Sequence, residues 1–171
     1  MAKQIRDSYA NKFYGTVTES AQGTLTFSEI QTNVAIFTKL AWILHRLEWY
    51  IPEATQQLLL SPADILQMAL TNSDNITALD LSAPAVVDMA ELQCVDRGTA
   101  GSMHLFEVPI IRDFSNLPGG GIIMAPRPLY AACVSASIAS AATVEVRGYF
   151  TQKELKADEY IELVDFYRIV E

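Results

Sequence analysis

The stretch LYAACVSASIASAATVEVRGYFTQ, residues 129–152, decides the fold class. It contains two apolar segments, 129–137 and 142–152, which are joined by a turn of small residues, IASA. In the second segment the side chains alternate between inward-facing Val144, Val146 and Phe150 and outward-facing Thr143, Glu145, Arg147 and Tyr149. Because successive side chains of a strand point to opposite faces, this alternation predicts an antiparallel pair of strands with one face buried.

The same pattern recurs toward the N-terminus. Pro, Gly, Ser, Asn or Asp bound each of eight short β-rich segments: 23–31, 39–51, 64–72, 85–95, 102–112, 121–124, 129–137 and 142–152. Residues 13–19 can add a short first strand. Pro109 within the fifth segment favours an edge position or a bulge. The series predicts one all-β domain, an antiparallel sandwich or barrel.

The longest segment, KLAWILHRLEWYI, is apolar on both faces at one end. One face carries Ala41, Ile43, His45, Leu47, Trp49 and Ile51, and the other carries Leu40, Trp42, Leu44, Arg46, Glu48 and Tyr50. Half of the 171 residues are hydrophobic, and the mean hydropathy is +0.18. This surplus indicates that part of the outside is buried against other subunits. We therefore expect Trp42, Leu44, Trp49 and Tyr50 at a subunit interface.

Two segments have helical composition. Residues 53–60 follow Pro52 and predict one or two helical turns between the strands at 39–51 and 64–72. Residues 153–171 predict a C-terminal helical tail outside the core domain, 13–152. The side of this tail that we expect to pack on the sandwich or on a neighbouring subunit carries Leu155, Tyr160, Leu163 and Phe166.

The tail also places four acids on one helix face, at spacings of four, four and three: Glu154, Asp158, Glu162 and Asp165. Such a row can share a divalent cation, but it is also typical of a solvated acidic face or of one that meets a basic neighbour. The spacing alone leaves these alternatives open.

The net charge is −8, which argues against a broad basic face for duplex binding. The N-terminal arm, residues 1–12, differs, because Lys3, Arg6 and Lys12 oppose only Asp7 and give it a charge of 3 − 1 = +2. These three cations are candidates for contacts with nucleic-acid phosphates; a solvated terminus, or one that exchanges with a neighbouring subunit, fits equally well. The chain has no apolar run long enough to span a membrane and no apolar region typical of a signal peptide at its start.

Residues that could carry catalysis are few. His45 lies on an apolar strand face, and His104 and Glu107 project to opposite faces of their strand. Cys94 and Cys133 lie in separate strands without metal-ligand spacing, which favours two buried thiols. Pro118 to Gly121 lacks the Lys-Ser/Thr of a phosphate loop and predicts a flexible hairpin turn. We expect no enzymatic activity, no cofactor and no bound metal.

The order of elements resembles the single jelly-roll coat proteins of small icosahedral viruses. The likeness covers residues 23–152 and is greatest over APRPLYAACVSASIASAATVEVRGYFTQKEL, residues 125–155, in which a strand opening Leu-Tyr leads through a small-residue turn to an alternating strand that ends in an aromatic pair. The resemblance implies an eight-stranded antiparallel jelly-roll sandwich with a short helix between the second and third strands and an interrupted sixth strand after PGGG. It also implies self-assembly into an icosahedral shell around a nucleic-acid genome, in virions assembled in the host cytoplasm.

The chain departs from that family in its weakly charged arm, since many such coat proteins carry an arginine-rich one. Either other molecules neutralise the genome or scattered residues do so: Arg46, Arg97, Arg112 and Arg127. A jelly-roll binding module, such as a carbohydrate-binding domain or a trimeric fibre head, is the alternative and would need exposed aromatic side chains on one face or loop end. A cupin-type enzyme would need several metal-binding histidines, and the chain has two.

Overall fold

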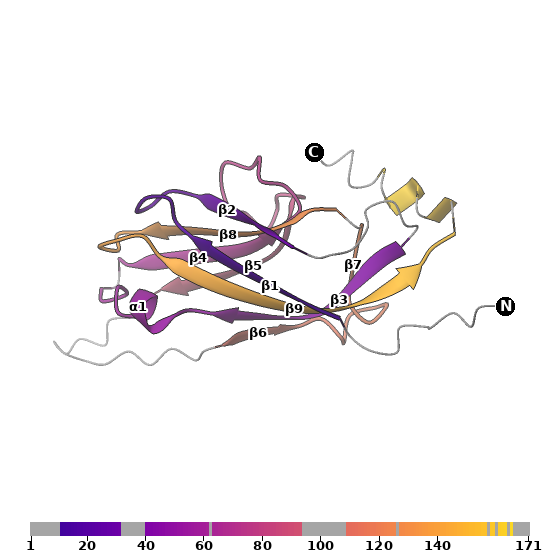
Figure 1. Ribbon diagram of the computed structural model, residues 1–171, viewed down its shortest axis with the longest axis horizontal. Coiled ribbons are helices and arrows are strands. Elements are labelled where there is room, and N and C mark those ends of the chain that lie inside the picture. The colour runs from indigo at the N-terminus through magenta and orange to yellow at the C-terminus, as the bar shows by residue number, and fades with distance from the viewer. Residues whose placement is uncertain are drawn as a thin grey trace.

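Two antiparallel β-sheets pack face to face in the computed structural model (Figure 1). The structure describes residues 11–31, 40–61, 63–93, 109–125, 127–156, 158–159, 161–163 and 165. Within them the strands are β1 (Asn11–Thr18), β2 (Thr26–Ile30), β3 (Leu40–Tyr50), β4 (Ile65–Thr71), β5 (Val86–Gln93), β6 (Ile110–Asp113), β7 (Ile122–Met124), β8 (Leu129–Ala136) and β9 (Thr143–Glu154). The predicted all-β sandwich is confirmed.

The pairing of the strands is nested. Sheet A has the order β1-β9-β3-β6, with β7 also paired to β3, and sheet B has the order β2-β8-β4-β5. Thus β1 pairs with β9, β2 with β8, β3 with β6 and β7, and β4 with β5. Each strand of the first half of the chain meets its counterpart from the second half, as in one long hairpin that is folded over on itself.

Most of the predicted strands occur where the pattern placed them, with three changes at their ends. The short first strand is a full strand, β1, which begins at Asn11, so Lys12 lies in sheet A and not in an arm. At the other end, β9 continues to Glu154, because Leu40 of β3 pairs with it there. Of the segment predicted at 102–112, residues 102–108 lie outside the described part, and β6 covers Ile110–Asp113.

A β-bulge in β3 corrects the interface prediction. The register of β3 against β9 shifts between Leu44 and Arg46, so the inward positions change from Trp42 and Leu44 to Leu47 and Trp49. A bulge adds one residue to one strand, and one residue is enough to exchange its two faces. Trp42, Leu44 and Trp49 are at most 1% exposed within the subunit core, so they do not form a subunit interface, whereas Tyr50 remains 46% exposed.

The core lies between the sheets and includes a group of aromatic rings from sheet A. The centroid of the Phe150 ring lies 5.1 Å from that of Trp42 and 6.0 Å from that of Phe13. Phe13 pairs with Gly148, and a Cβ at Gly148 would lie 2.1 Å from the Phe13 ring. The Phe13 ring therefore fills the space that a side chain at position 148 would need, and any residue larger than glycine would displace the ring.

The helical segments differ from the prediction where the structure describes them. Helix α1 (Glu53–Gln56) occupies four residues of the predicted 53–60. In the tail, residues 158–159, 161–163 and 165 are helical. Because Glu154 ends β9, it does not continue a helical row with the other three acids of the tail, and the predicted four-carboxylate face is wrong. Asp158, Glu162 and Asp165 are exposed.

Candidate functional site

The outward side of sheet A carries charged and aromatic side chains in rows that cross its strands. Three rows run across β1, β9 and β3: Lys12, Tyr149 and Arg46; Tyr14, Arg147 and Glu48; Thr16, Glu145 and Tyr50. The residues between them in sequence point into the core, as the buried Phe13, Val146 and Trp49 illustrate. These nine residues are the outer face of sheet A, and the strand alternation of the sequence predicted the three that belong to β9.

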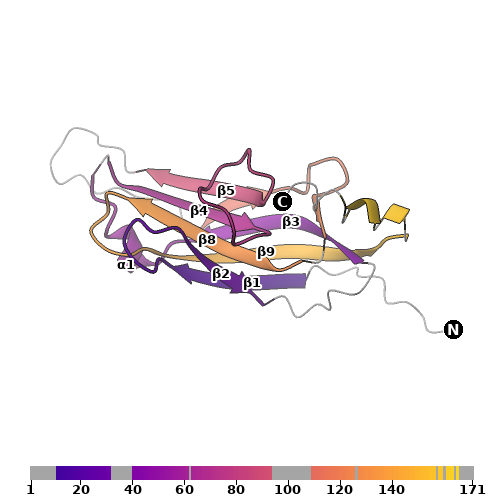
Figure 2. The same ribbon diagram turned by 90° about the horizontal axis from the view of Figure 1, so that it is seen from above.

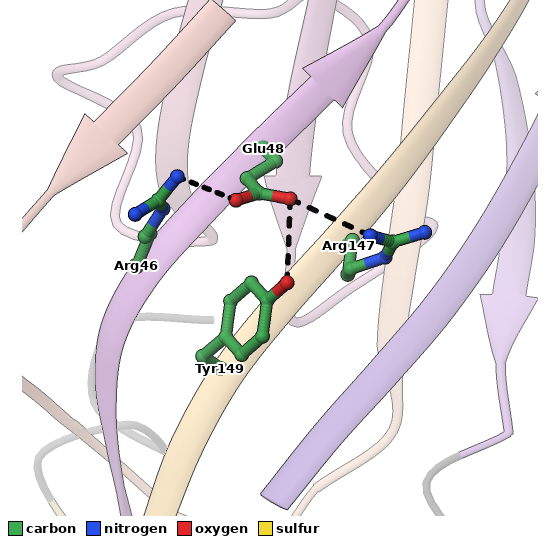
Figure 3. Close-up of polar contacts among 4 residues, drawn as sticks. All are labelled: Arg46, Glu48, Arg147 and Tyr149. Atoms are coloured by element: carbon green, nitrogen blue, oxygen red, sulfur yellow. Dashed lines mark hydrogen bonds and ion pairs between the residues drawn. The ribbon is translucent and has the colours of Figure 1, made fainter. Parts of the chain in front are cut away.

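Glu48 is the centre of a polar cluster on this face (Figure 3). Its Oε1 lies 2.7 Å from an Nη atom of Arg46, and its Oε2 lies 3.8 Å from an Nη atom of Arg147. The Tyr149 hydroxyl donates to Oε2 across 3.4 Å. The Glu48 side chain is only 14% exposed, so its carboxylate has little contact with water. The two guanidinium groups compensate its negative charge. Tyr149, and to a smaller extent Glu48, raises the pKa of Arg147, which keeps its positive charge fixed.

Beside this cluster the face is hollowed. A cavity of about 250 Å³ is lined by Tyr14, Glu48, Tyr50, Pro109, Glu145, Val146 and Arg147. Tyr14 is 53% exposed and Tyr50 is 46% exposed, although tyrosine rings of a sheet are usually packed. The Thr16 hydroxyl donates to the Tyr14 hydroxyl across 2.9 Å and restrains that ring. Sequence reasoning missed this hollow, since only the register brings the two tyrosines together.

Part of the outward side of sheet B is apolar, while Gln67 and Glu91 on the same side are hydrogen-bonded to each other. A hydrophobic cluster separate from the core between the sheets lies there. Its buried residues are Ala69, Leu79, Val86 and Ala132, and the partly buried residues that pack against them are Leu25, Phe27, Ile76, Ala83, Met89 and Val134. Leu79 belongs to the β4–β5 loop, residues 72–85, which lies over sheet B in both views (Figures 1 and 2). The β4–β5 loop of the same chain thus covers part of the apolar surface that, from the composition, was expected to be buried against other subunits.

Two carboxylates connect elements across the sandwich. Glu19, which is 4% exposed, accepts hydrogen bonds from the amides of Ser135 and Ala142 at 2.7 Å and from the Ser135 hydroxyl, so it ties the end of β1 to β8 and β9. Asp88 of sheet B accepts hydrogen bonds from Arg112 of sheet A at 3.2 and 3.3 Å. Burial raises the pKa of Asp88 more than Arg112 lowers it.

His45 holds the glycine-rich turn against the bulge. Its Nδ1 lies 2.7 Å from the carbonyl oxygen of Gly120, so this nitrogen carries the proton, and its Nε2 lies 2.8 Å from the Thr151 hydroxyl. Gly119 and Gly120 have positive φ angles of 89° and 80°, which the turn needs at that point. Both ring nitrogens of His45 are therefore hydrogen-bonded, while His104 lies outside the described residues.

The other predicted site residues are dispersed. Lys3, Arg6, Cys94, Arg97, Tyr160 and Phe166 lie outside the described residues. Leu155 is 8% exposed, Leu163 is half-buried, and burial raises the pKa of the Cys133 thiol to about 12, as expected for an inert core cysteine. Arg46 lies on the outer face of sheet A, Arg112 is bound to Asp88, and Arg127 precedes β8, so these arginines do not form one patch.

Within the described ranges, no three His, Cys, Asp or Glu side chains are grouped so that they could hold a metal ion. The helices of that same part of the chain are all too short or too polar to cross a membrane. No protein-family model matches the sequence, and no curated protein matches it significantly.

Proposed function

We propose that this sandwich is a jelly roll and that the protein is a structural subunit, which self-associates into a closed icosahedral shell around a nucleic-acid genome. The observation that carries the proposal is the nested pairing of the strands. Nine described strands fill eight positions, because β6 and β7 both pair with β3. A chain of four plus four strands that pairs from its ends inward and closes into two four-position sheets has the topology of a jelly roll.

The β6–β7 edge of sheet A supports self-association. Among the described strands, β6 and β7 end that sheet, and a sheet edge is a place where another chain can pack. Three large apolar side chains of the segment 110–124 lie exposed there: Ile111 at 49%, Leu117 at 45% and Ile123 at 44%. This β6–β7 edge replaces the buried tryptophans as the proposed subunit interface, together with the half-buried Leu163.

Contact with the genome falls in this proposal to Lys3, Arg6 and Lys12. Lys12 is exposed on β1 and belongs to the outer face of sheet A. With a net charge of −8 for the whole chain, the subunit leaves most of the neutralisation to other cations. The proposed location is the virion, and the proposed partners are further copies of the chain and the packaged nucleic acid.

Sedimentation velocity and negative-stain electron microscopy of the purified protein test the proposal. We expect uniform closed particles, whose absorbance ratio at 260 and 280 nm shows nucleic acid that resists nuclease. The double variant Ile111→Asp/Ile123→Asp should keep its far-UV spectrum and lose the particles. The matched control is Leu81→Asp, at a residue that is 62% exposed in the β4–β5 loop. A stable monomer at tens of micromolar across salt and pH would refute the proposal.

Two truncations separate the roles of the termini. Removal of residues 1–10 leaves β1 whole, and it should preserve the particles and lower their nucleic-acid content. Removal of residues 157–171 leaves β9 and the buried Leu155 in place, and it should reduce particle yield more strongly. Normal shells without the tail, and none without the arm, would reverse this assignment.

A further inference from the structure

The hollow on the outer face of sheet A has two aromatic walls. Tyr14 stands on β1 and Tyr50 on β3, and β9 runs between these strands, so the two strands lie about 10 Å apart and the tyrosines occupy neighbouring rows. Both rings are about half exposed, and Tyr14 is restrained by the hydrogen bond from Thr16. Tyrosine offers a large amphipathic surface and loses little conformational entropy on binding. The walls are therefore suited to a flat ligand that is apolar on one face.

The floor of the hollow is polar. Strand β9 supplies Glu145 and Arg147 there, and β3 supplies Glu48. The Glu145 carboxylate has no hydrogen-bond or ion-pair partner among the residues that the structure describes, although it lies at the surface of a sheet rich in donors. Arg147 is 53% exposed and reaches Glu48 only at 3.8 Å. The Glu145 carboxylate can thus accept hydrogen bonds from a ligand, and the Arg147 guanidinium can donate them.

The charges of the lining residues select the class of ligand. Glu48, Glu145 and Arg147 sum to 1 − 2 = −1, so a phosphate or carboxylate would meet more negative than positive charge. A hydroxyl group, in contrast, can donate to a carboxylate and accept from a guanidinium. Neighbouring hydroxyls on a ring would use Glu145 and Arg147 together, since these residues are two apart on the same face of β9.

We infer that this hollow binds a neutral saccharide, with one pyranose ring against the Tyr14 and Tyr50 side chains and its hydroxyls on Glu145 and Arg147. The volume of about 250 Å³ lies just below the usual range for small-molecule pockets and suits a single sugar unit of a longer glycan. Glu48, which also lines the hollow, pairs with Arg147 at 3.8 Å and helps to orient it. This site does not depend on the proposed shell, because all of its residues come from one subunit.

Saturation-transfer difference NMR with the methyl pyranosides of glucose, galactose, mannose and N-acetylglucosamine tests the inference. At least one of these should receive saturation with a Kd on the order of 1 mM, as expected for one ring on an open site. Tyr50→Ala and Tyr14→Ala should each weaken binding about fivefold or more. Glu145→Gln, which keeps the shape and removes the charge, should weaken it about threefold to tenfold.

Tyr130→Ala is the matched control, because Tyr130 is a half-buried tyrosine of sheet B, and it should leave binding unchanged. Far-UV spectra and melting curves establish that each variant is folded. The inference is overturned if none of the four glycosides receives saturation, if binding persists in both tyrosine variants, or if thymidine 5′-monophosphate binds more tightly than every glycoside. Saturation transfer detects binding to single subunits as well as to large particles. The saccharide experiment can therefore be interpreted even if the protein does not assemble into particles.

Discussion

The outer faces of the two sheets differ in what covers them. On sheet A, Tyr14 and Tyr50 stand about half exposed beside a charged cluster. On sheet B, apolar side chains continue outward and lie under the chain's own β4–β5 loop, with Leu79 only 8% exposed. Both sheets share one core, so packing between them does not explain the contrast. The outward residues of each strand decide whether a face remains open for a ligand or is closed by the chain itself.

The largest expected effect separates the core from the outer face along a single strand. Trp42→Ala should lower the free energy of unfolding by about 3–5 kcal/mol, because it leaves a cavity beside Phe150. Tyr50→Ala, at an exposed position of the same strand, should change it by about 0.5 kcal/mol or less. Urea denaturation measures both. Equal losses would mean that the bulge does not set the inward positions of β3.

The next effect compares the two outer faces directly. Leu79→Ala should cost about 2–3 kcal/mol, since it removes the buried contact between the β4–β5 loop and sheet B. Tyr14→Ala on sheet A should cost about 0.5 kcal/mol. Limited proteolysis in the 72–85 loop should increase in the first variant alone. A stable, protease-resistant Leu79→Ala protein would show that the loop does not depend on this cluster.

Asp88 lies between the faces, at the edge where the sheets are joined by an ion pair. Its folded pKa is raised above 3.8 by burial, so the folded state binds this proton more tightly than the unfolded state does. The contribution to stability is therefore present below about pH 4 and is lost as pH rises through the folded pKa. Asp88→Asn should abolish this loss of stability with rising pH. At pH 7 its free energy of unfolding should equal that of the wild type or exceed it by about 1 kcal/mol.

Urea denaturation between pH 3 and pH 7 gives the difference in free energy of unfolding between the wild type and Asp88→Asn. The contributions of the other carboxylates cancel in this difference. Asp113→Asn is the control of opposite sign, because hydrogen bonds from Ser115 lower the pKa of Asp113. Its contribution is present above the unfolded pKa and is lost as pH falls through the folded value. If Asp88→Asn were less stable than the wild type only at high pH, the pair with Arg112 would outweigh burial.

The smallest expected effect concerns the Glu48 cluster. Glu48→Gln should reduce stability by about 0.3–1 kcal/mol at low ionic strength, since its partners Arg46 and Arg147 are 42% and 53% exposed. The difference from the wild type should shrink in 1 M salt, because screening weakens surface ion pairs. Thermal denaturation at two salt concentrations measures it. A loss that is independent of salt would indicate a packing role for the side chain instead.

Strand β9 was predictable and β8 was only partly so. In β9 the outward Glu145, Arg147 and Tyr149 alternate with buried residues, which is the pattern of a sheet with one face in water. In β8, Ala131, Ala132 and Cys133 are all buried, because core and outer cluster enclose both faces there. A strand that is buried on both sides is apolar throughout and shows no alternation. The sequence therefore predicts that the strand exists, but not which of its residues face the core.

The sequence by itself therefore determined the all-β class, the positions of most strands and the inward set of β9, because these depend on local alternation and on turn residues. Only the tertiary structure decided the inward set of β3, where the bulge at His45 exchanges the faces and moves Trp42 and Leu44 into the core. It also decided that Tyr14 and Tyr50 flank one hollow. Both outcomes depend on register between strands far apart in the chain, and no local pattern encodes the register that the packed sheets select.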